Sequence, residues 1–167
     1  MSTEIERKFK VAEDWRVPPQ ATAERLRQAY LTPSGVPVEF RVRAGEGTRL
    51  MTAKTFDPAS GAMVRQEVEF PVADEVFDQL WDLAGGECLS KVRWSVPLDG
   101  HLATVDEYDG ALTGLRVVEV EFADIEAARA FVPPHWFGEE ITGSPAWSNR
   151  ELAARARTGQ HTEGENR

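Results

Sequence analysis

The segment TEIERKFKV, residues 3–11, alternates strictly between two kinds of side chain. Glutamates at positions 4 and 6 and lysines at positions 8 and 10 share one parity, and mainly apolar residues share the other. A period of two predicts a β-strand, in which same-face side chains stand about 7 Å apart. Two carboxylates and an amine in one row can hold a hard divalent cation together with an anionic ligand. A solvated edge strand would show the same alternation, so the choice depends on the rest of the chain.

The same alternation recurs along the chain, each time with one apolar face and one charged face. It predicts further strands at residues 23–31, 39–43, 49–56, 63–72, 88–98, 101–108 and 115–122. Short turns join most of these segments, as at residues 57–61 (DPASG), and short turns favour antiparallel pairing. Helices are expected at 73–84, where apolar residues recur at helical spacing, at 124–132 and at 146–157.

These elements constrain the architecture. The helices can cover the apolar faces of the strands, but no element remains to cover the charged faces. Eight twisted strands tend to curl, and closure removes their exposed edges. We therefore predict an α+β, mainly β fold: a closed eight-stranded antiparallel β-barrel with the helices packed outside and a charged lumen. A sandwich with a salt-bridged surface is less consistent with charges that align by parity on nearly every strand.

The composition narrows the class of protein. With 167 residues, 41% of them hydrophobic and 28% charged, the chain suits one soluble domain, which we place at residues 1–157. Residues 158–167 contain no apolar side chain and are expected to form a disordered tail. The net charge of −9 argues against binding to nucleic-acid phosphates. No apolar run is long enough to span a membrane, and no secretory signal is visible.

The chain has a single cysteine, Cys88, which permits no internal disulfide. This usage fits a reducing, cytoplasmic compartment. Cys88 lies between Glu87 and Leu89 on an expected strand, so we interpret it as a small core residue rather than a nucleophile. The sequence specifies no oligomeric state, and a homodimer is one compatible form.

The charged faces of the expected strands carry as many acids as bases. The candidate lumen residues are Glu4, Glu6, Glu67, Glu69, Asp106, Glu119 and Glu121 together with Lys8, Arg41, Arg43, Lys54, Arg65, Lys91 and Arg93. Burying so many charges for stability alone is implausible, because desolvation commonly cancels the attraction within ion pairs. The set suits a ligand with several negative charges plus a metal, since arginine forks match phosphate oxygens and carboxylates bind Mg²⁺ or Mn²⁺. No His/Cys cluster suggests zinc, and no P-loop motif is present.

In this order and spacing the motifs resemble those of the CYTH domain, or triphosphate tunnel metalloenzyme, family. The resemblance covers residues 3–155 and is carried by EIERK (4–8), RVR (41–43), MTAK (51–54), RQEVE (65–69), KVR (91–93), VDEY (105–108), VEVE (118–121) and WFGEEIT (136–142). It implies an eight-stranded antiparallel tunnel, in agreement with the closure argument. The short bacterial members that this chain resembles hydrolyse inorganic tripolyphosphate with a divalent metal, which implies a cytoplasmic triphosphatase that uses Mg²⁺ or Mn²⁺.

The resemblance also implies roles for individual residues. It assigns the metal to Glu4, Glu6, Asp106, Glu119 and Glu121, and the triphosphate to Lys8, Arg41, Arg43, Lys54, Lys91 and Arg93. Lys8 and Tyr30 would form a pair that activates water, because an amine beside several cations can serve as a general base. The alternative for Tyr30 is a core aromatic residue with a wet tip. Arg65, Glu67 and Glu69 would form an outer shell, in which the glutamates either reach metal through water or hold arginines in place.

One segment departs from the family pattern and leaves the substrate open. Residues 143–149 contain no basic residue, whereas several short members of the family carry lysines and arginines there. If this segment caps the tunnel mouth, substrate binding or substrate preference is expected to differ from that of those members. Trp147 is interpreted as a packing residue rather than a stacking platform. A thiamine triphosphatase or a class IV adenylate cyclase would use the same tunnel, but no site for thiamine or adenine is evident. A binding module without catalysis would need the cations but not the pair of Lys8 and Tyr30.

Overall fold

The computed structural model describes residues 2–33, 35–56 and 64–159. Its main strands are β1 (Ser2–Val11), β2 (Thr22–Tyr30), β3 (Val38–Gly45), β4 (Thr48–Phe56), β5 (Val64–Pro71), β6 (Cys88–Leu98), β7 (His101–Tyr108) and β8 (Arg116–Glu121). The turn expected at 57–61 and the first residue of the fifth expected strand, Met63, lie outside the described residues. So does the expected tail from residue 160 onward.

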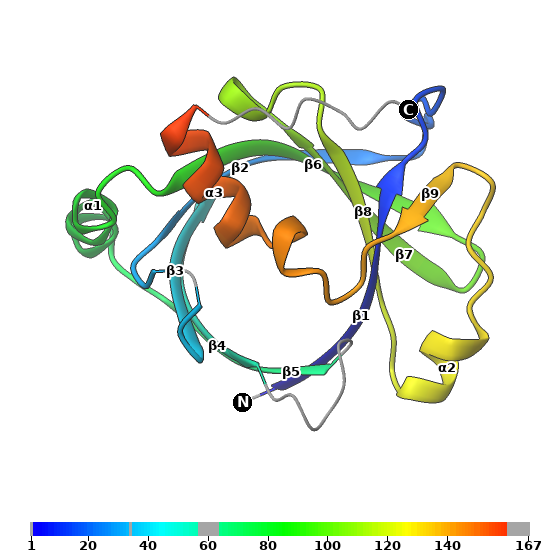
Figure 1. Cartoon of the computed structure of the whole chain (residues 1–167), viewed down its shortest axis with the longest axis horizontal. Coiled ribbons are helices and arrows are strands. Elements are labelled where there is room, and N and C mark those ends of the chain that lie inside the picture. Colours follow the sequence, from blue (N-terminus) through cyan, green and yellow to red (C-terminus); the bar gives the residue numbers. More distant parts are fainter. Residues whose placement is uncertain (1, 34, 57–63, 160–167) are drawn as a thin grey trace.

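The eight strands close into an antiparallel barrel, as predicted (Figure 1). The order β5-β4-β3-β2-β6-β7-β8-β1 is closed by pairing of β1 with β5, so neither end strand keeps a free edge. Residues that were expected on the charged faces are paired across neighbouring strands, as are Arg93 with Asp106 and Lys8 with Glu119. The charged faces of β1, β3, β4, β5, β6 and β8 therefore line one shared lumen.

A short ninth strand, β9 (Phe137–Glu140), was not expected from the sequence. β5 pairs with β1 only over Ser2–Ile5, and β9 takes the same edge of β1 farther along, opposite Phe9 and Val11. Only four residues long, β9 carries two consecutive glutamates, so it has too few positions to show an alternation. The position of β9 beside β1 matters because the residues that follow β9 lead directly to the end of the barrel.

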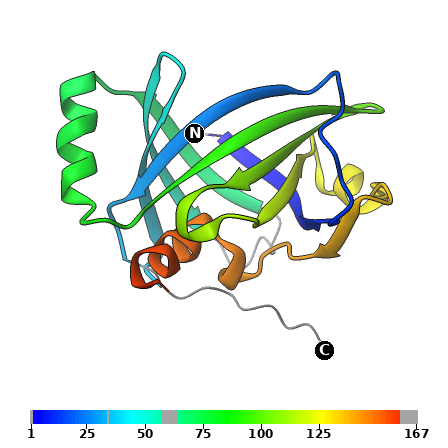
Figure 2. The same ribbon diagram turned by 90° about the horizontal axis from the view of Figure 1, so that it is seen from above.

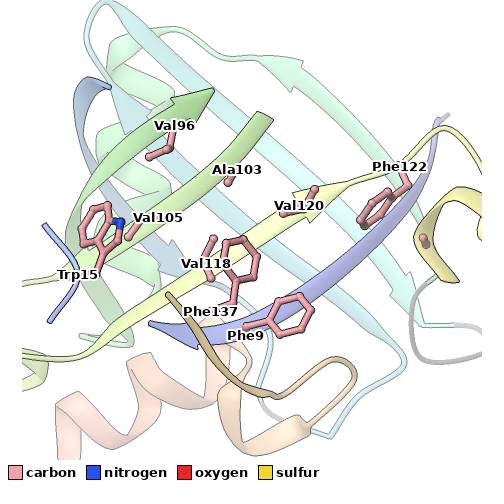
Figure 3. Packing of buried hydrophobic residues seen from close by; sticks show 10 residues of the cluster. Phe9, Trp15, Val96, Ala103, Val105, Val118, Val120, Phe122 and Phe137 are labelled. Carbon is pink, nitrogen blue, oxygen red and sulfur yellow. The ribbon is translucent and has the colours of Figure 1, made fainter. Parts of the chain in front are cut away.

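Two helices pack outside the barrel, as predicted. Phe77 of α1 (Asp74–Leu83) is buried against Val42 and Ala44 of β3. α2 (Ile125–Ala130) is capped by Asp124, whose carboxylate accepts a hydrogen bond from the Ala127 N–H at 2.7 Å. Next to α2, the outer faces of β1, β7 and β8 form the largest apolar cluster with β9 (Figure 3). It contains Phe9, Trp15, Val96, Ala103, Val105, Val118, Val120, Phe122, Ala128 and Phe137. Cys88 is half-buried beside the cluster under α1.

The third helix differs from its expected place. α3 (Asn149–Thr158) follows a single 3₁₀ turn at Pro145–Trp147 and lies across one end of the barrel rather than along its outer wall (Figures 1 and 2). Its buried Leu152 and Ala153 pack against residues of lumen parity, including Tyr30, Leu89, Tyr108 and Val117. These four strand residues carry no charge, so the lumen ends in an apolar floor that α3 covers. None of the helices in the described ranges is long and apolar enough to cross a membrane.

Candidate active site

The lumen contains a cavity of about 270 Å³ above this floor. Its wall has seven acids and six bases: Glu4, Glu6, Glu39, Glu67, Glu69, Glu119 and Glu121 with Lys8, Arg41, Arg43, Lys54, Arg65 and Arg93. The segment after β9, residues 141–144 and 147–149, closes one side and contributes no charged group. We call residues 141–149 the cap segment. The stretch without basic residues is therefore part of the cavity wall, as expected of a tunnel mouth.

The carboxylates of β5 hold the cations of neighbouring strands. Glu67 Oε2 lies 2.6 Å from Lys54 Nζ and 3.9 Å from Arg41 Nη2. Glu69 Oε2 lies 3.2 Å from Arg43 Nη2 and accepts a hydrogen bond from the hydroxyl of Thr52 at 2.9 Å. This arrangement corresponds to the second of the two roles considered for Glu67 and Glu69, in which they fix the cations. Thr52 is uncharged, and its only sequence signal is its position on the lumen face of β4, in register with Glu69.

The carboxylates of β1 and β8 face one another across the strand pair. Glu6 is the register partner of Glu121. Burial raises the pKa of Glu6, with repulsion from Glu119 adding to it. Burial likewise raises the pKa of Glu121, and Glu4 and Glu119 raise it further. Burial alone would raise the pKa of Glu119, but Lys8 and Arg93 outweigh it and hold that pKa well below its usual range.

This group of carboxylates has the chemistry of a site for Mg²⁺ or Mn²⁺, since both prefer hard, charged oxygen donors. Within residues 2–33, 35–56 and 64–159, however, no three Asp, Glu, His or Cys side chains are arranged to hold one ion. Three of the carboxylates are instead paired with cations: Glu4 lies 2.6 Å from Lys54 Nζ, Glu6 lies 3.5 Å from Arg65 and Glu119 lies 2.9 Å from Lys8 Nζ. Glu121 alone of these four has no ion pair in the described part of the chain. The donor set therefore fits the ion in its chemistry, while the spacing of the side chains in this structure does not form a complete site.

Two predicted site residues lie behind the cavity wall. Asp106 and Lys91 are each 1% exposed, and neither lines the cavity. Asp106 accepts hydrogen bonds from Arg93 Nε at 2.7 Å, from Arg93 Nη2 at 2.8 Å and from Lys91 Nζ at 2.5 Å. Burial alone would raise the pKa of Asp106, but Lys91 and Arg93 outweigh it and lower that pKa. Asp106 thus orients the guanidinium of Arg93, which does reach the cavity.

Burial lowers the pKa of Lys91 from 10.5 to about 7, despite the opposing attraction of Asp106. Between these values the unfolded chain binds a proton that the folded protein has released. The free energy of unfolding should therefore rise with pH across this window, by up to about 1.4 kcal/mol per pH unit. We expect Lys91→Met to remove this slope and Lys10→Met, at a half-exposed lysine, to keep it. Urea unfolding between pH 7 and 10 measures both, and parallel curves for the native protein and Lys91→Met would contradict the assignment.

Tyr30 is fully enclosed, at 1% exposure, and lies in the apolar floor. Its hydroxyl accepts a hydrogen bond from Gln28 Nε2 at 2.5 Å, and burial raises its pKa, so the phenol stays protonated. Lys8 Nζ instead contacts Glu119 Oε1. The two residues predicted to act together thus have different partners in this structure, with Lys8 in the cavity wall and Tyr30 beneath it.

Glu39, Tyr108 and Trp147 connect the site to its surroundings. Glu39 lines the cavity and contacts Arg150 of α3, with Nε and Oε2 3.8 Å apart. The Tyr108 hydroxyl donates a hydrogen bond to Asn149 Oδ1, which joins the floor to the first residue of α3. Tyr108 belongs to a quoted motif, but nothing in the sequence indicates that α3 lies within its reach. Trp147 packs at the edge of the floor cluster, as expected, and also lines the cavity beneath Lys10 Nζ, 4.8 Å from its ring centre.

The sequence matches the family model of the CYTH domain over residues 2–141. The chain belongs to the CYTH domain family. An inorganic triphosphatase of Nitrosomonas europaea is 41% identical over 153 residues, 90% of this chain and 97% of that protein. An inorganic triphosphatase of Acetivibrio thermocellus is 30% identical over 154 residues, 91% and 94% of the two chains. A crystal structure of an inorganic triphosphatase aligns with a TM-score of 0.67 at 38% identity, and covers 92% of this chain and 95% of that one.

The family match ends at Ile141, the first residue of the cap segment. The CYTH domain of this chain therefore includes the whole barrel and β9, with every charged residue of the cavity wall. The rest of the cap segment and α3 lie beyond the matched residues. The charged barrel thus lies wholly within the matched residues.

Proposed function

We propose that this CYTH protein is an inorganic triphosphatase that hydrolyses tripolyphosphate to pyrophosphate and phosphate. The observation that carries the proposal is the barrel cavity, in which guanidinium and ammonium groups alternate with carboxylates and one end is closed by an apolar floor. Arg41, Arg43, Lys54 and Arg93 converge on it from three strands and suit phosphate oxygens. The relatives that share the barrel over most of its length are inorganic triphosphatases.

The charge of the cavity explains why a metal would be needed. Its seven acids exceed its six bases, so a highly anionic substrate alone would meet a wall with no net positive charge. A divalent cation such as Mg²⁺ or Mn²⁺ would neutralise part of the phosphate charge and orient the attacking water. Glu4, Glu6, Glu119 and Glu121 are the residues that would hold it. Asp106 would join them only by leaving Lys91 and Arg93, to which it is bonded behind the wall.

Hydrolysis requires a water molecule to attack a terminal phosphorus while the P–O bond to the leaving pyrophosphate breaks. Lys8 is the proposed general base: its side chain lines the cavity and, after the ammonium has released a proton to solvent, the neutral amine can accept a proton from that water. The arginines would bind the substrate phosphates and the departing pyrophosphate. Tyr30, beneath the wall, interacts with Gln28 and Arg41 and would act on Lys8 only indirectly.

A phosphate-release screen tests the proposal. Tripolyphosphate, thiamine triphosphate, ATP and pyrophosphate would each be incubated with the protein and with Mg²⁺, Mn²⁺ or EDTA. We expect the fastest release from tripolyphosphate, with a divalent metal only. Faster turnover of thiamine triphosphate would identify a thiamine triphosphatase, and formation of cyclic AMP from ATP would identify an adenylate cyclase that uses the same cavity. Tight binding of tripolyphosphate without cleavage would identify a binding module instead.

We expect Arg93→Ala and Arg43→Ala to raise KM for tripolyphosphate. Each removes a charged fork from the cavity wall, and a phosphate contact made equally in ground and transition states appears in KM. Arg25→Ala is the matched control, because Arg25 pairs with Asp109 at 2.6 Å and does not line the cavity. Steady-state kinetics at fixed Mg²⁺ measure the three variants. Unchanged kcat and KM in both cavity variants would show that these arginines do not face the substrate.

A further inference from the structure

Arg7 is the only charged residue on the outward parity of residues 3–11. Its neighbours on that face include Ile5 and Phe9, and its side chain is only 14% exposed. A guanidinium in such surroundings needs several partners to offset its desolvation. The family motif EIERK contains it, yet no role in binding or catalysis follows from its position outside the lumen.

The guanidinium of Arg7 connects three elements. Nη1 donates hydrogen bonds to the carbonyls of Ala128 at 3.0 Å and Phe131 at 2.9 Å, at the end of α2. Nε and Nη2 form a fork on the carboxylate of Glu140 in β9, at 2.8 Å and 2.7 Å. The ring of Phe9 lies 5.0 Å from the guanidinium carbon. Only the planar fork of arginine can serve a carboxylate and two carbonyls at once.

Glu140, which Arg7 holds in place, is in turn bonded to the cap segment. Its Oε1 accepts a hydrogen bond from the hydroxyl of Thr142 at 2.7 Å. The same hydroxyl accepts a hydrogen bond from the backbone N–H of Lys8 at 3.0 Å. The carbonyl of Lys8 accepts from the N–H of Ile141 at 2.8 Å. Both backbone groups of Lys8 on this edge are therefore satisfied by the cap segment, and one of them by a side chain.

Within the described residues, this edge of β1 beyond Ile5 is bonded only to β9 and its flanking segments. β5 pairs only as far as Ile5, so the strand beyond it depends on β9 and on Thr142 for its hydrogen bonds. Thr142 also lines the cavity. A shift of its hydroxyl would move the backbone that carries the proposed base and the neutral wall of the cavity together.

We propose that Arg7 is a positioning residue for the active site, which acts through Glu140 and Thr142 to fix the backbone of Lys8. The inference rests on the proposed function, because it assigns Arg7 to the same reaction. Arg7 touches no group in the cavity and so makes no contact with substrate. Its effect is on the placement of Lys8 and of the cap segment.

The test uses Arg7→Lys, Glu140→Gln and Thr142→Val in the full chain. Glu139→Gln is the matched control, since Glu139 precedes Glu140, is 67% exposed and pairs with Lys10 outside the cavity. At a temperature well below every melting transition, we expect kcat to fall about 10-fold in the three variants, with little change in KM, because small misplacements of reacting groups are costly. The double variant Arg7→Lys/Thr142→Val should lose no more than the stronger single variant, since both act through one chain of contacts.

Amide hydrogen exchange at Lys8 provides a readout that does not depend on catalysis. Thr142→Val and Arg7→Lys should both accelerate this exchange, and Glu139→Gln should not. If the native protein cleaves no triphosphate but exchange responds as expected, the proposed function fails while the positioning contacts stand. Lowered melting temperatures with unchanged kcat and unchanged exchange at Lys8, or additive losses of kcat in the double variant, would overturn the inference.

Discussion

Replacement of Lys8 by alanine or arginine is expected to lower kcat by about 10²–10⁴, the usual contribution of a positioned general base. Alanine removes the amine, whereas arginine keeps the positive charge but cannot release its proton in the working pH range. If the charge of Lys8 alone mattered, Lys8→Arg would retain most of the activity. Equal losses of kcat in the two variants would therefore indicate that Lys8 acts as a base and not only as a phosphate-binding cation. Single-turnover rates with saturating metal and tripolyphosphate measure the chemical step.

Tyr30→Phe is the matched control for Lys8. It keeps the ring in the apolar floor and removes a hydroxyl that is bonded to Gln28, so the expected loss is smaller than that of either Lys8 variant. All three variants should still bind tripolyphosphate with Mg²⁺ by calorimetry, because the arginines and carboxylates remain. Native rates in both Lys8 variants would remove Lys8 as the base. A larger loss in Tyr30→Phe than in Lys8→Ala would place the phenol in the reaction itself.

Glu121→Gln is expected to abolish metal-dependent turnover while the protein stays folded. The loss should exceed the roughly 10–100-fold effect of outer-shell partners, because the variant removes a charged oxygen donor from the proposed metal site. Mg²⁺ that binds the native protein should raise its melting temperature, and the variant should lose this response. Glu46→Gln, in an exposed turn, is the control. Full activity with ordinary metal dependence in Glu121→Gln would refute the assignment.

The same variant should stabilise the metal-free protein at neutral pH. The pKa of Glu121 is raised in the folded state, first by burial and then by Glu4 and Glu119. As pH rises through the unfolded value of 4.5, the unfolded chain releases its proton first, so folding becomes less favourable until the folded group also ionises. Above that range the penalty is complete, and glutamine avoids it. Melting curves in EDTA should show a gain at pH 7 that disappears below pH 4.5.

Much of the barrel could be predicted from local pattern. Alternation has a period of two in any strand, so the charged parity of residues 3–11 and of the later strands identified a shared lumen before any contact was known. Register then places Glu6 beside Glu121 and Lys8 beside Glu119, which brings predicted metal and substrate residues of distant segments to one wall. These features depend on side-chain direction along each strand, which the sequence specifies.

Depth within the lumen could not be predicted, because parity gives the direction of a side chain but not its distance from the axis or its partners. Asp106 and Lys91 lie on the same face of the sheet as Arg93, yet they pair behind the wall and only Arg93 reaches the cavity. The position of α3 across the barrel end depends on the cap segment, whose path follows from four residues of β9 beside β1. The partners of Arg7 could not be predicted either. Its position in the alternation indicated apolar neighbours, and only the fold brings α2 and Glu140 to it. The alternation of residues therefore determined the barrel and its charge, whereas contacts between strands determined which charges line the cavity.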